Sequence, residues 1–224
     1  FDSSNDCFAQ NVRQENGFPV FDAVLYDERI QNIKLSVLGT HNILNALAAI
    51  ACCHKLGVGM DVIIETLESF GGTERRFDIV GMTDAGVQIV DDYAHHPTEI
   101  KATLAAAQNV PHKQLWCLFQ PHTYTRTLAL FDEFADAFEK ADKVVLAEIY
   151  AAREKNIYKV SSKELVNEIK AKHPGKEVYY FKDFDEIANF VSNNAEAGDL
   201  VITMGAGDIY KVADIMLERD WKKR

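Results

Sequence analysis

In the later part of the chain, short apolar runs alternate with longer stretches whose apolar positions recur at helical spacing. The apolar runs predict buried strands and the stretches between them predict helices. The predicted strands are Gln88–Asp91, Leu115–Phe119, Lys143–Glu148, Glu177–Phe181 and Asp199–Met204, and the predicted helices are 98–108, 125–140, 162–171, 184–193 and 208–218. Strand–helix units in this succession predict an α/β fold with a mostly parallel, doubly wound sheet and helices on both faces.

Residues 1–74 follow a different pattern, with short alternating segments and then two helical stretches. Strands are predicted at Phe8–Val12, Pro19–Tyr26 and Ile33–Val37, and helices at Ile43–Leu56 and Asp61–Phe70, with Asp61 as the expected N-cap. Asn16-Gly17 is a hairpin turn signal. We therefore expect a small antiparallel sheet with two helices. The flexible break Gly71-Gly72-Thr73 suggests a boundary between a domain at 1–74 and one at 75–224.

Composition excludes several classes of protein. The formal net charge of −10 argues against a nucleic-acid surface, which needs a basic footprint. No apolar stretch is long enough for a membrane span, and the first residues do not resemble a signal peptide. The four cysteines form no C-x-x-C, so a zinc site is not expected, and reduced thiols favour the cytoplasm. The chain starts at Phe1 rather than Met, which suggests a fragment; its oligomeric state stays open.

Polar groups gather in the segment 91–99, where a predicted strand ends and a helix begins. Asp91, Asp92, Tyr93, His95 and His96 follow the apolar run, and side chains at the carboxyl end of a parallel strand point into the crevice where ligands bind. A carboxylate can accept two ribose hydroxyls, and an imidazole can bind phosphate or act as a base. Alternatively, this is a capping loop in which the carboxylates accept turn amides and His96 caps the helix.

A second polar segment, 120–127, follows the strand Leu115–Phe119. His122 and Arg126 would lie near the positive N-terminus of the next helix, a favourable place for an anion, and Thr125 could cap that helix. Arg126 could form a forked contact with a carboxylate or phosphate. The alternative is a surface loop with a capping threonine.

Gly205-Ala206-Gly207 follows the last strand, and its glycines would let backbone N–H groups approach an anion. Plain turn geometry explains such glycines equally well. No G-x-x-x-x-G-K-[ST] phosphate-binding loop occurs in the chain.

A fourth set combines a helix start with two adjacent arginines. Asn42 and Asn45 would share a helical face beside His41, and two amides there can read the edges of a purine. Arg75 and Arg76 could reach phosphates. The alternatives are helix capping by Asn42 and a solvated linker at the arginines.

Together these motifs resemble the ATP-dependent Mur ligases of bacterial cell-wall synthesis, and most closely the branch that adds alanine. The matching stretches are Gly39-Thr40-His41-Asn42-Ile43-Leu44-Asn45-Ala46-Leu47-Ala48-Ala49, Arg75-Arg76-Phe77, Asp91-Asp92-Tyr93-Ala94-His95-His96-Pro97-Thr98-Glu99, Phe119-Gln120-Pro121-His122-Thr123-Tyr124-Thr125-Arg126-Thr127 and Gly205-Ala206-Gly207. Their order and spacing match along nearly the whole chain.

The resemblance implies a domain organisation and a reaction. The family has a UDP-binding domain, a central ATPase domain and a Rossmann-like C-terminal domain, so 1–74 resembles the end of the central domain and 75–224 the last domain. ATP would phosphorylate the carboxylate of UDP-N-acetylmuramate, and the amine of L-alanine would attack the acyl phosphate. The ligands of the accompanying Mg²⁺ would lie mostly in parts that this chain lacks, so the chain alone is not expected to catalyse the reaction.

The resemblance also implies roles for residues. His41, Asn42 and Asn45 would hold adenine, Arg75 or Arg76 the ATP phosphates, and Asp92 the ribose. Tyr93, His95, His122 and Arg126 would line the site for alanine and the muramoyl carboxylate, with Gly205 and Ala206 beside it; His95, His122 and Arg126 are the expected catalytic residues. Many relatives have Arg where this chain has Thr123, which places more weight on Arg126.

Three other functions share some of these sequence features. A sister ligase attaches a preformed tripeptide to UDP-N-acetylmuramate during wall recycling, and shares the ATP-binding groups. A non-catalytic module that binds nucleotide or a partner fits a chain without a phosphate-binding loop. An NAD-dependent dehydrogenase is disfavoured, because no G-x-G-x-x-G follows the first strand of the later domain.

Overall fold

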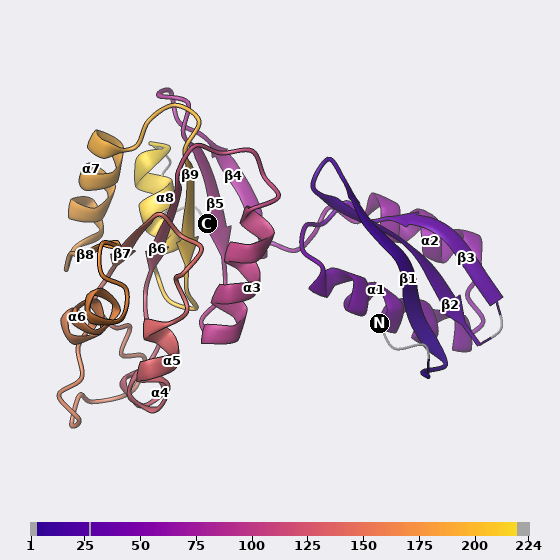
Figure 1. Cartoon of the computed structure of the whole chain (residues 1–224), viewed down its shortest axis with the longest axis horizontal. Helices are drawn as coiled ribbons and strands as arrows, with labels where there is room; N and C mark the ends of the chain where they lie inside the picture. The colour runs from indigo at the N-terminus through magenta and orange to yellow at the C-terminus, as the bar shows by residue number, and fades with distance from the viewer. Residues whose placement is uncertain (1–3, 27, 219–224) are drawn as a thin grey trace. The chain divides into compact units, whose positions relative to one another are not determined.

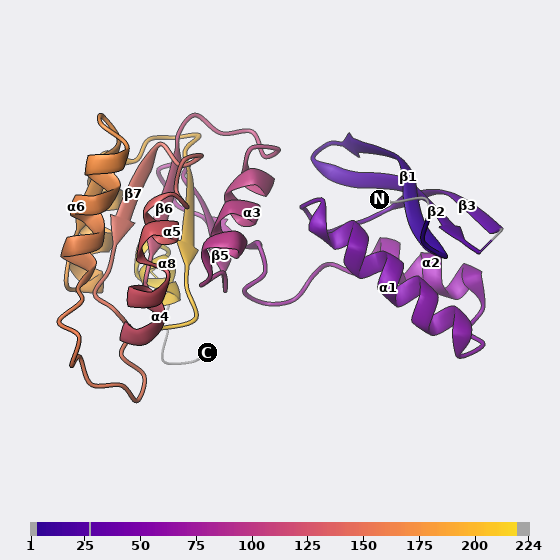
Figure 2. The same cartoon turned by 60° about the horizontal axis from the view of Figure 1, so that its bottom comes forward.

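The computed structural model describes residues 4–26 and 28–218 and divides the chain into two compact units, Phe1–Thr73 and Glu74–Arg224 (Figure 1). The first unit contains β1 (Cys7–Glu15), β2 (Phe18–Leu25), β3 (Glu28–Lys34), α1 (His41–Lys55) and α2 (Met60–Ser69). Its strands form an antiparallel sheet in the order β1-β2-β3, and both helices pack on one face of it (Figure 2). None of the described helices is both long and apolar enough to span a membrane.

Local signals in the first unit were predicted with mixed success. The hairpin at Asn16-Gly17 is confirmed, because both residues have positive φ, 52° and 86°, as a type I′ turn requires. The strand predicted at Ile33–Val37 lies earlier in the chain, as β3 at Glu28–Lys34. This edge strand is largely exposed, and its charged and amide side chains obscure the alternation of apolar and polar residues by which strands are recognised.

The two helices of this unit start earlier than predicted. α1 starts at His41, so Asn42 lies in its first turn rather than at the cap. The N-cap of α2 is Gly59, and Asp61 lies within the first turn. Gly57 ends α1: its N–H donates to the carbonyl of His54, and the N–H of Val58 donates to that of Cys53, the paired bonds of a Schellman motif.

The second unit is a six-stranded sheet in the order β4-β5-β9-β6-β7-β8, and only β4 is antiparallel to its neighbour. The strands are β4 (Asp78–Met82), β5 (Gln88–Asp92), β6 (Leu115–Phe119), β7 (Lys143–Leu146), β8 (Glu177–Tyr180) and β9 (Leu200–Met204). The helices are α3 (Pro97–Ala107), α4 (Tyr124–Ala129), α5 (Phe131–Ala135), α6 (Ser162–Lys172), α7 (Phe184–Asn194) and α8 (Tyr210–Met216). The mostly parallel α/β sheet predicted from the sequence is therefore confirmed.

Two apolar cores cover the faces of this sheet. Alternation along β6 sends Leu115, Cys117 and Phe119 to one face, against α3, α5 and α6, and sends Trp116 and Leu118 to the other, against α7 and α8 (Figure 1). All five of these side chains are fully buried. Strands covered on both faces read as continuous apolar runs, which is why their positions were predictable.

Three local predictions for this unit were wrong. β4 was missed because it is a short edge strand whose Ile79 and Met82 are exposed, so only Val80 joins the core. The predicted helix 125–140 is broken at Leu130, which leaves helical geometry (φ −115°, ψ 25°). The break allows Phe134 and Phe138 to pack on Phe119, at ring-centroid distances of 5.6 and 5.3 Å. The predicted helix 208–218 is α8, which is shorter at both ends.

Candidate active site

The five parallel strands of the second unit end at the same level. Asp92 at the end of β5 pairs with Met204 of β9, which pairs with Phe119 of β6, and the register continues to Leu146 and Tyr180. The loops 93–96, 205–209 and 120–123 therefore leave the sheet side by side at its carboxyl edge, as the sequence predicted. This edge is where open α/β sheets bind ligands.

Asp91 lies under this edge as a fully enclosed carboxylate. Its side chain is 1% exposed and accepts a hydrogen bond from Thr203 Oγ1 at 2.7 Å and an ion-paired bond from Arg75 Nε at 2.9 Å. Thr203 is itself buried in the central strand β9. Asp91 therefore ties β5 to β9 and to the segment that enters the unit.

Arg75 reaches from that segment across the glycine loop. Its Nη2 donates to the carbonyl oxygens of Gly205 at 2.7 Å and Gly207 at 3.4 Å, and its guanidinium lies 5.0 Å from the ring of Tyr93 and 4.8 Å from that of Tyr210. Arg76, in contrast, is exposed; its guanidinium lies 5.7 Å from the centroid of the Tyr93 ring and close enough to the carboxylates of Asp92 and Glu99 to act on them electrostatically. Arg76 is the arginine of this pair that is available to a ligand.

Asp92 is also turned inward. Its carboxylate accepts the N–H of Phe77 at 2.8 Å and of Ala94 at 2.7 Å, and only 5% of the residue is exposed. Burial raises the pKa of Asp92, and these two N–H groups and Arg76 oppose that rise. The geometry matches the loop-holding alternative for Asp92 better than a ribose contact.

The start of α3 confirms the capping alternative for His96. The His96 ring accepts the N–H of Thr98, and Glu99 accepts the N–H of His96 at 3.2 Å and of His95 at 2.9 Å, which forms a capping box. Burial raises the pKa of Glu99, but the N–H bonds and nearby cationic charge more than offset this, so the net shift is downward.

His95 faces the next loop. Its Nδ1 lies 2.9 Å from the carbonyl oxygen of Tyr93, which can only accept, so the proton of the neutral ring sits on Nδ1 and Nε2 is left as an acceptor. The ring packs edge-on against Tyr93 at 5.4 Å and against His122 at 6.2 Å. The sequence-predicted residues Tyr93, His95 and His122 are thus brought together.

The loop 120–127 contains buried polar atoms that lack partners. His122 Nδ1 and Arg126 Nη1 are both buried, and neither has a hydrogen-bond partner within residues 4–26 and 28–218. Burial lowers the pKa of His122, as do the charges of Arg126 and His95, while Glu154 opposes them. Buried groups of this kind cost free energy unless something binds them, so this is the part of the edge that is prepared for a ligand.

Gln120 joins this loop to the glycine loop. Its Oε1 accepts the N–H of Asp208 at 2.8 Å, and its Nε2 donates to the carbonyl of Glu148 at 3.2 Å. A Cβ at Gly207 would lie 2.5 Å from Gln120 Oε1 and 2.9 Å from the Tyr150 ring, so no side chain fits there. The glycines of 205–207 therefore allow close packing as well as turn geometry.

The N-terminus of α4 differs from the prediction. The helix has six residues, its N-cap position is Thr123, and Thr125 does not cap it. Instead the N–H and the hydroxyl of Thr125 both donate to Glu154, 29 positions later. A carboxylate of the chain itself thus occupies the place where the sequence predicted an external anion.

The first unit holds the remaining predicted residues. Asn45 donates to Asn42 Oδ1 at 2.9 Å, which confirms that the two amides share a face of α1, and Asn42 donates to the carbonyl of Leu38 at 2.7 Å. Asn45 and His41 are exposed. The His41 ring lies so close to Gly39 that a Cβ there would be 2.6 Å from it.

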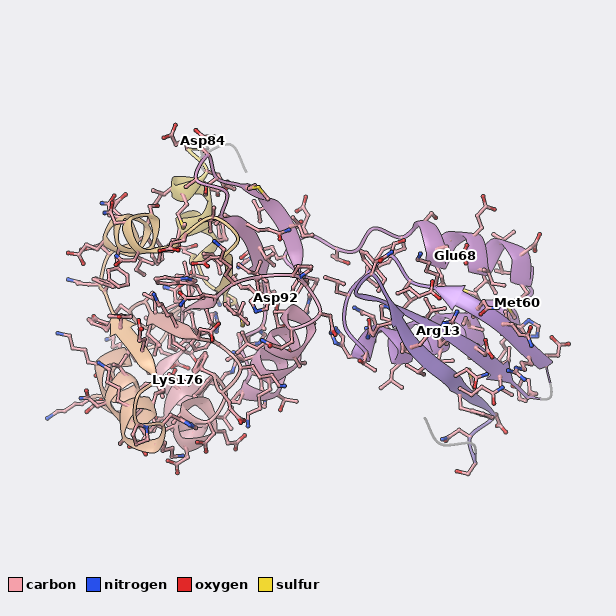
Figure 3. All side chains as sticks on the ribbon, turned by 45° about the horizontal axis from the view of Figure 1, so that its top comes forward. Arg13, Met60, Glu68, Asp84, Asp92 and Lys176 are labelled. Atoms are coloured by element: carbon pink, nitrogen blue, oxygen red, sulfur yellow. The ribbon has the colours of Figure 1, made fainter. Side chains whose placement is uncertain are left out.

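Two cavities lie away from this edge. Two cavities of about 310 and 280 Å³ lie at the opposite, amino-terminal edge of the sheet, lined by residues such as Met82, Asp84 and Leu217 in one and Lys113, Lys143 and Asp199 in the other. Figure 3 shows Asp84 at the tip of the β4–β5 turn, away from Asp92. Across the described parts of the chain, no three His, Cys, Asp or Glu side chains are grouped to hold a metal ion.

Sequence reasoning missed Tyr150, Glu154 and Thr203 as parts of this edge. Tyr150 stacks on His122 with ring centroids 5.4 Å apart and an interplanar angle of 20°. Tyr150 and Glu154 follow a predicted strand just as the three recognised loops do. That position at a strand end was the available signal, but neither residue belongs to a known local motif.

Comparison with known proteins gives a consistent result. Residues 75–207 match the family described as Mur ligase, glutamate ligase domain. The chain is 49% identical over 216 residues to the UDP-N-acetylmuramate–L-alanine ligase of Clostridium novyi, covering 96% of this chain and 46% of that protein. It is 50% identical over 208 residues to the ligase of the same name from Caldanaerobacter subterraneus, covering 93% and 45%. The chain thus spans about half the length of these relatives.

Solved structures agree with this match. The UDP-N-acetylmuramate–alanine ligase of Thermotoga maritima superimposes with a TM-score of 0.81 at 28% identity, over 100% of this chain and 47% of that one. A murein peptide ligase of Psychrobacter arcticus has a TM-score of 0.71 at 25% identity, over 97% and 45%.

Proposed function

The chain belongs to the Mur ligase family, and we propose that it is the C-terminal part of an ATP-dependent ligase that joins L-alanine to the carboxylate of UDP-N-acetylmuramate in peptidoglycan synthesis. The first unit would be the end of the central ATPase domain and the second the C-terminal domain. Four free cysteines are compatible with work in the cytoplasm.

The observation that carries this proposal is the pair of buried nitrogens at His122 and Arg126 that have no hydrogen-bond partner among the residues the structure describes. Both substrates bring a carboxylate to the reaction, and a guanidinium beside an imidazole suits such an anion. The relatives of nearly 50% identity bear the name of this reaction.

Within this proposal the four aromatic and cationic groups divide the work. Arg126 binds a substrate carboxylate, and Tyr93 and His95 form the wall beside it, next to the Gly205-Ala206 turn. Burial and the charges of Arg126 and His95 lower the pKa of His122 and so favour its neutral form, which can accept the proton that the alanine nitrogen loses as it attacks the acyl phosphate. Positioning and charge stabilisation then supply most of the rate gain.

ATP supplies the phosphoryl group that activates the muramoyl carboxylate. We assign adenine to the exposed amide face formed by Asn42 and Asn45, with His41 beside it, and the phosphates to Arg76. Arg75 and Asp92 are engaged inside the protein, so we assign them to holding the loops rather than to direct contact. Within the described ranges, no three His, Cys, Asp or Glu side chains are grouped to hold Mg²⁺.

Reconstitution tests the proposal. The full-length enzyme, meaning this chain together with the upstream domains that the proposal requires, should release phosphate from ATP only when UDP-N-acetylmuramate and L-alanine are both present. The 224-residue chain alone should release none. Release by the isolated chain, or a full-length enzyme indifferent to alanine, would contradict the proposal.

A second candidate is a murein peptide ligase, favoured by the structural similarity to the Psychrobacter arcticus enzyme. The same assay separates the two, because that enzyme class would use a preformed tripeptide in place of alanine. Equilibrium binding of ATP by the isolated chain, without turnover in the full-length protein, would instead favour a non-catalytic module.

A further inference from the structure

The segment Tyr150–Glu154, which follows β7, is joined to the loop 120–127 at several points. The N–H of Tyr150 donates to the carbonyl of Pro121 at 2.9 Å, and the N–H of Thr123 donates to the carbonyl of Tyr150 at 2.9 Å. The Tyr150 ring stacks on His122. The segment therefore forms one wall of the site, although none of its residues is assigned a role above.

Glu154 completes this wall with a contact of its own. Its Oε2 accepts the N–H of Thr125 at 2.9 Å, and its Oε1 accepts the hydroxyl of Thr125 at 2.5 Å. Because α4 has six residues, this contact holds the first of its two turns, and Arg126 is the next residue. An isolated helix of this length is not stable, so its position depends on such tertiary contacts.

The backbone before α4 needs this support. Thr123 has φ 66° and ψ 146°, a region that β-branched residues rarely adopt. Such strain persists only where neighbouring contacts fix it. The contacts here are the bond to Tyr150, the bonds that the Thr123 carbonyl accepts from Thr127, and the contact of Glu154 with Thr125, two residues further on.

We propose that Glu154 is a positioning residue for the amino-acid site: it fixes the first turn of α4 and thereby the placement of Arg126 and His122. The expected effect on the KM for alanine rests on the proposed function, whereas the structural role of Glu154 does not. Glu154 does not need to touch a substrate, because both of its carboxylate oxygens are engaged by Thr125.

Electrostatics gives the proposal a reporter that does not depend on activity. The charged and titratable groups that act on His122 are Arg126 and His95, which lower its pKa together with burial, and Glu154, which raises it. The other ring packed against His122 is that of Tyr150. Removing the Glu154 charge should therefore lower the pKa of His122 further.

The first experiment is an NMR titration of the His122 ring in the 224-residue chain. We expect Glu154→Gln to lower the His122 pKa and Glu154→Asp, which keeps the charge, to change it less. Glu133→Gln, which removes an exposed charge from α5, is the control and should leave it unchanged. An equal pKa in the wild type and in Glu154→Gln would overturn the proposed coupling of Glu154 to His122.

The second experiment uses the full-length ligase to separate the effect of the side-chain length at position 154 from the effect of its charge. Glu154→Ala and Glu154→Asp should raise the KM for alanine about 10-fold with a smaller change in kcat, whereas Glu154→Gln, which keeps an acceptor of the same length, should raise it less. Thr125→Val should act in the same direction and should add little to Glu154→Ala, because the two residues share one contact.

The outcomes are distinct. An unchanged KM for alanine in Glu154→Ala overturns the positioning role. The role is also overturned if kcat falls while KM does not change, and if the fall in kcat matches the fraction of the variant that is unfolded. If the full-length protein has no alanine-dependent activity but the His122 pKa still shifts in Glu154→Gln, the proposed function fails and the structural role of Glu154 stands.

Discussion

The loops 91–99 and 120–127 lie at the same edge of one sheet, on either side of β9, and contain similar residue types, but they use them in opposite ways. In the first loop the side chains of Asp91, Asp92 and Glu99 all accept hydrogen bonds from within the protein. In the second, His122 Nδ1 and Arg126 Nη1 are buried without a partner in the described parts of the chain. The first loop mainly holds the site together, and the second mainly presents it to a ligand.

The largest effect tests the holding role. Asp91→Ala should lower the free energy of unfolding of the second unit by about 3 kcal/mol, because Arg75 and Thr203 lose a buried partner. Urea unfolding followed by tryptophan fluorescence reports on this unit, which contains both tryptophans. Asp84→Ala, at the exposed β4–β5 turn, should change stability by less than about 0.5 kcal/mol. If Asp91→Ala and Asp84→Ala lower the free energy of unfolding equally, Asp91 has no special role in holding the site together.

The converse experiment removes a ligand-seeking group. Arg126→Ala should raise the KM for alanine on the order of 10- to 100-fold in the full-length ligase, through loss of a charge-assisted hydrogen bond. The stability of the chain should change little, because Arg126 Nη1 has no partner to lose among the described residues. Lys101→Ala, at an exposed position of α3, is the control for loss of a positive charge. If Arg126→Ala instead lowers the free energy of unfolding strongly and leaves the kinetics unchanged, the loop 120–127 holds the structure together and does not present a group to a ligand.

A smaller effect concerns backbone strain, which the second loop carries at Thr123. Thr123→Gly should raise the free energy of unfolding by about 1 kcal/mol, because glycine adopts positive φ without a steric penalty. Thr98→Gly, in the first turn of α3, should lower stability instead, since glycine is unfavourable in a helix. If Thr123→Gly is the less stable protein, the side chain of Thr123 contributes more than its backbone costs.

The smallest effect is the pH dependence of stability through His122. Its pKa is lowered from 6.5 in the folded protein, so the unfolded chain binds the proton more readily. The contribution of neutral His122 to the free energy of unfolding is therefore complete above pH 6.5, the pKa in the unfolded chain. It is lost as the pH falls through the lower pKa that His122 has in the folded protein. His122→Asn should flatten this dependence, and Arg126→Ala should move the His122 pKa back toward 6.5. Unfolding measured across this pH range checks both.

Sequence predicted the features that depend on local signals. The Asn16-Gly17 turn and the buried parallel strands both follow from short-range preferences, and both are present. That the three polar loops meet at one edge also followed, because parallel strands share a direction.

The remaining features depend on contacts between distant residues. Whether Asp92 faces a ribose or a backbone amide depends on Phe77, which lies on another segment. The sequence of the loop 120–127 does not reveal that Glu154 will occupy the first turn of α4. For the same reason the break at Leu130 could not be predicted: it is set by the fit of two phenylalanines onto β6.

The central place of β9 has a consequence for biosynthesis. This strand is near the end of the chain, yet it lies between β5 and β6 and forms hydrogen-bonded ladders with both. While the chain is being made, Asp92 and Phe119 have no common neighbour until residues 200–204 arrive, so the edge that contains both loops cannot assemble earlier. Long-range pairing of this kind slows folding. A nascent chain stalled before β9 should therefore expose two apolar strand edges, those of β5 and β6, the kind of surface that promotes aggregation.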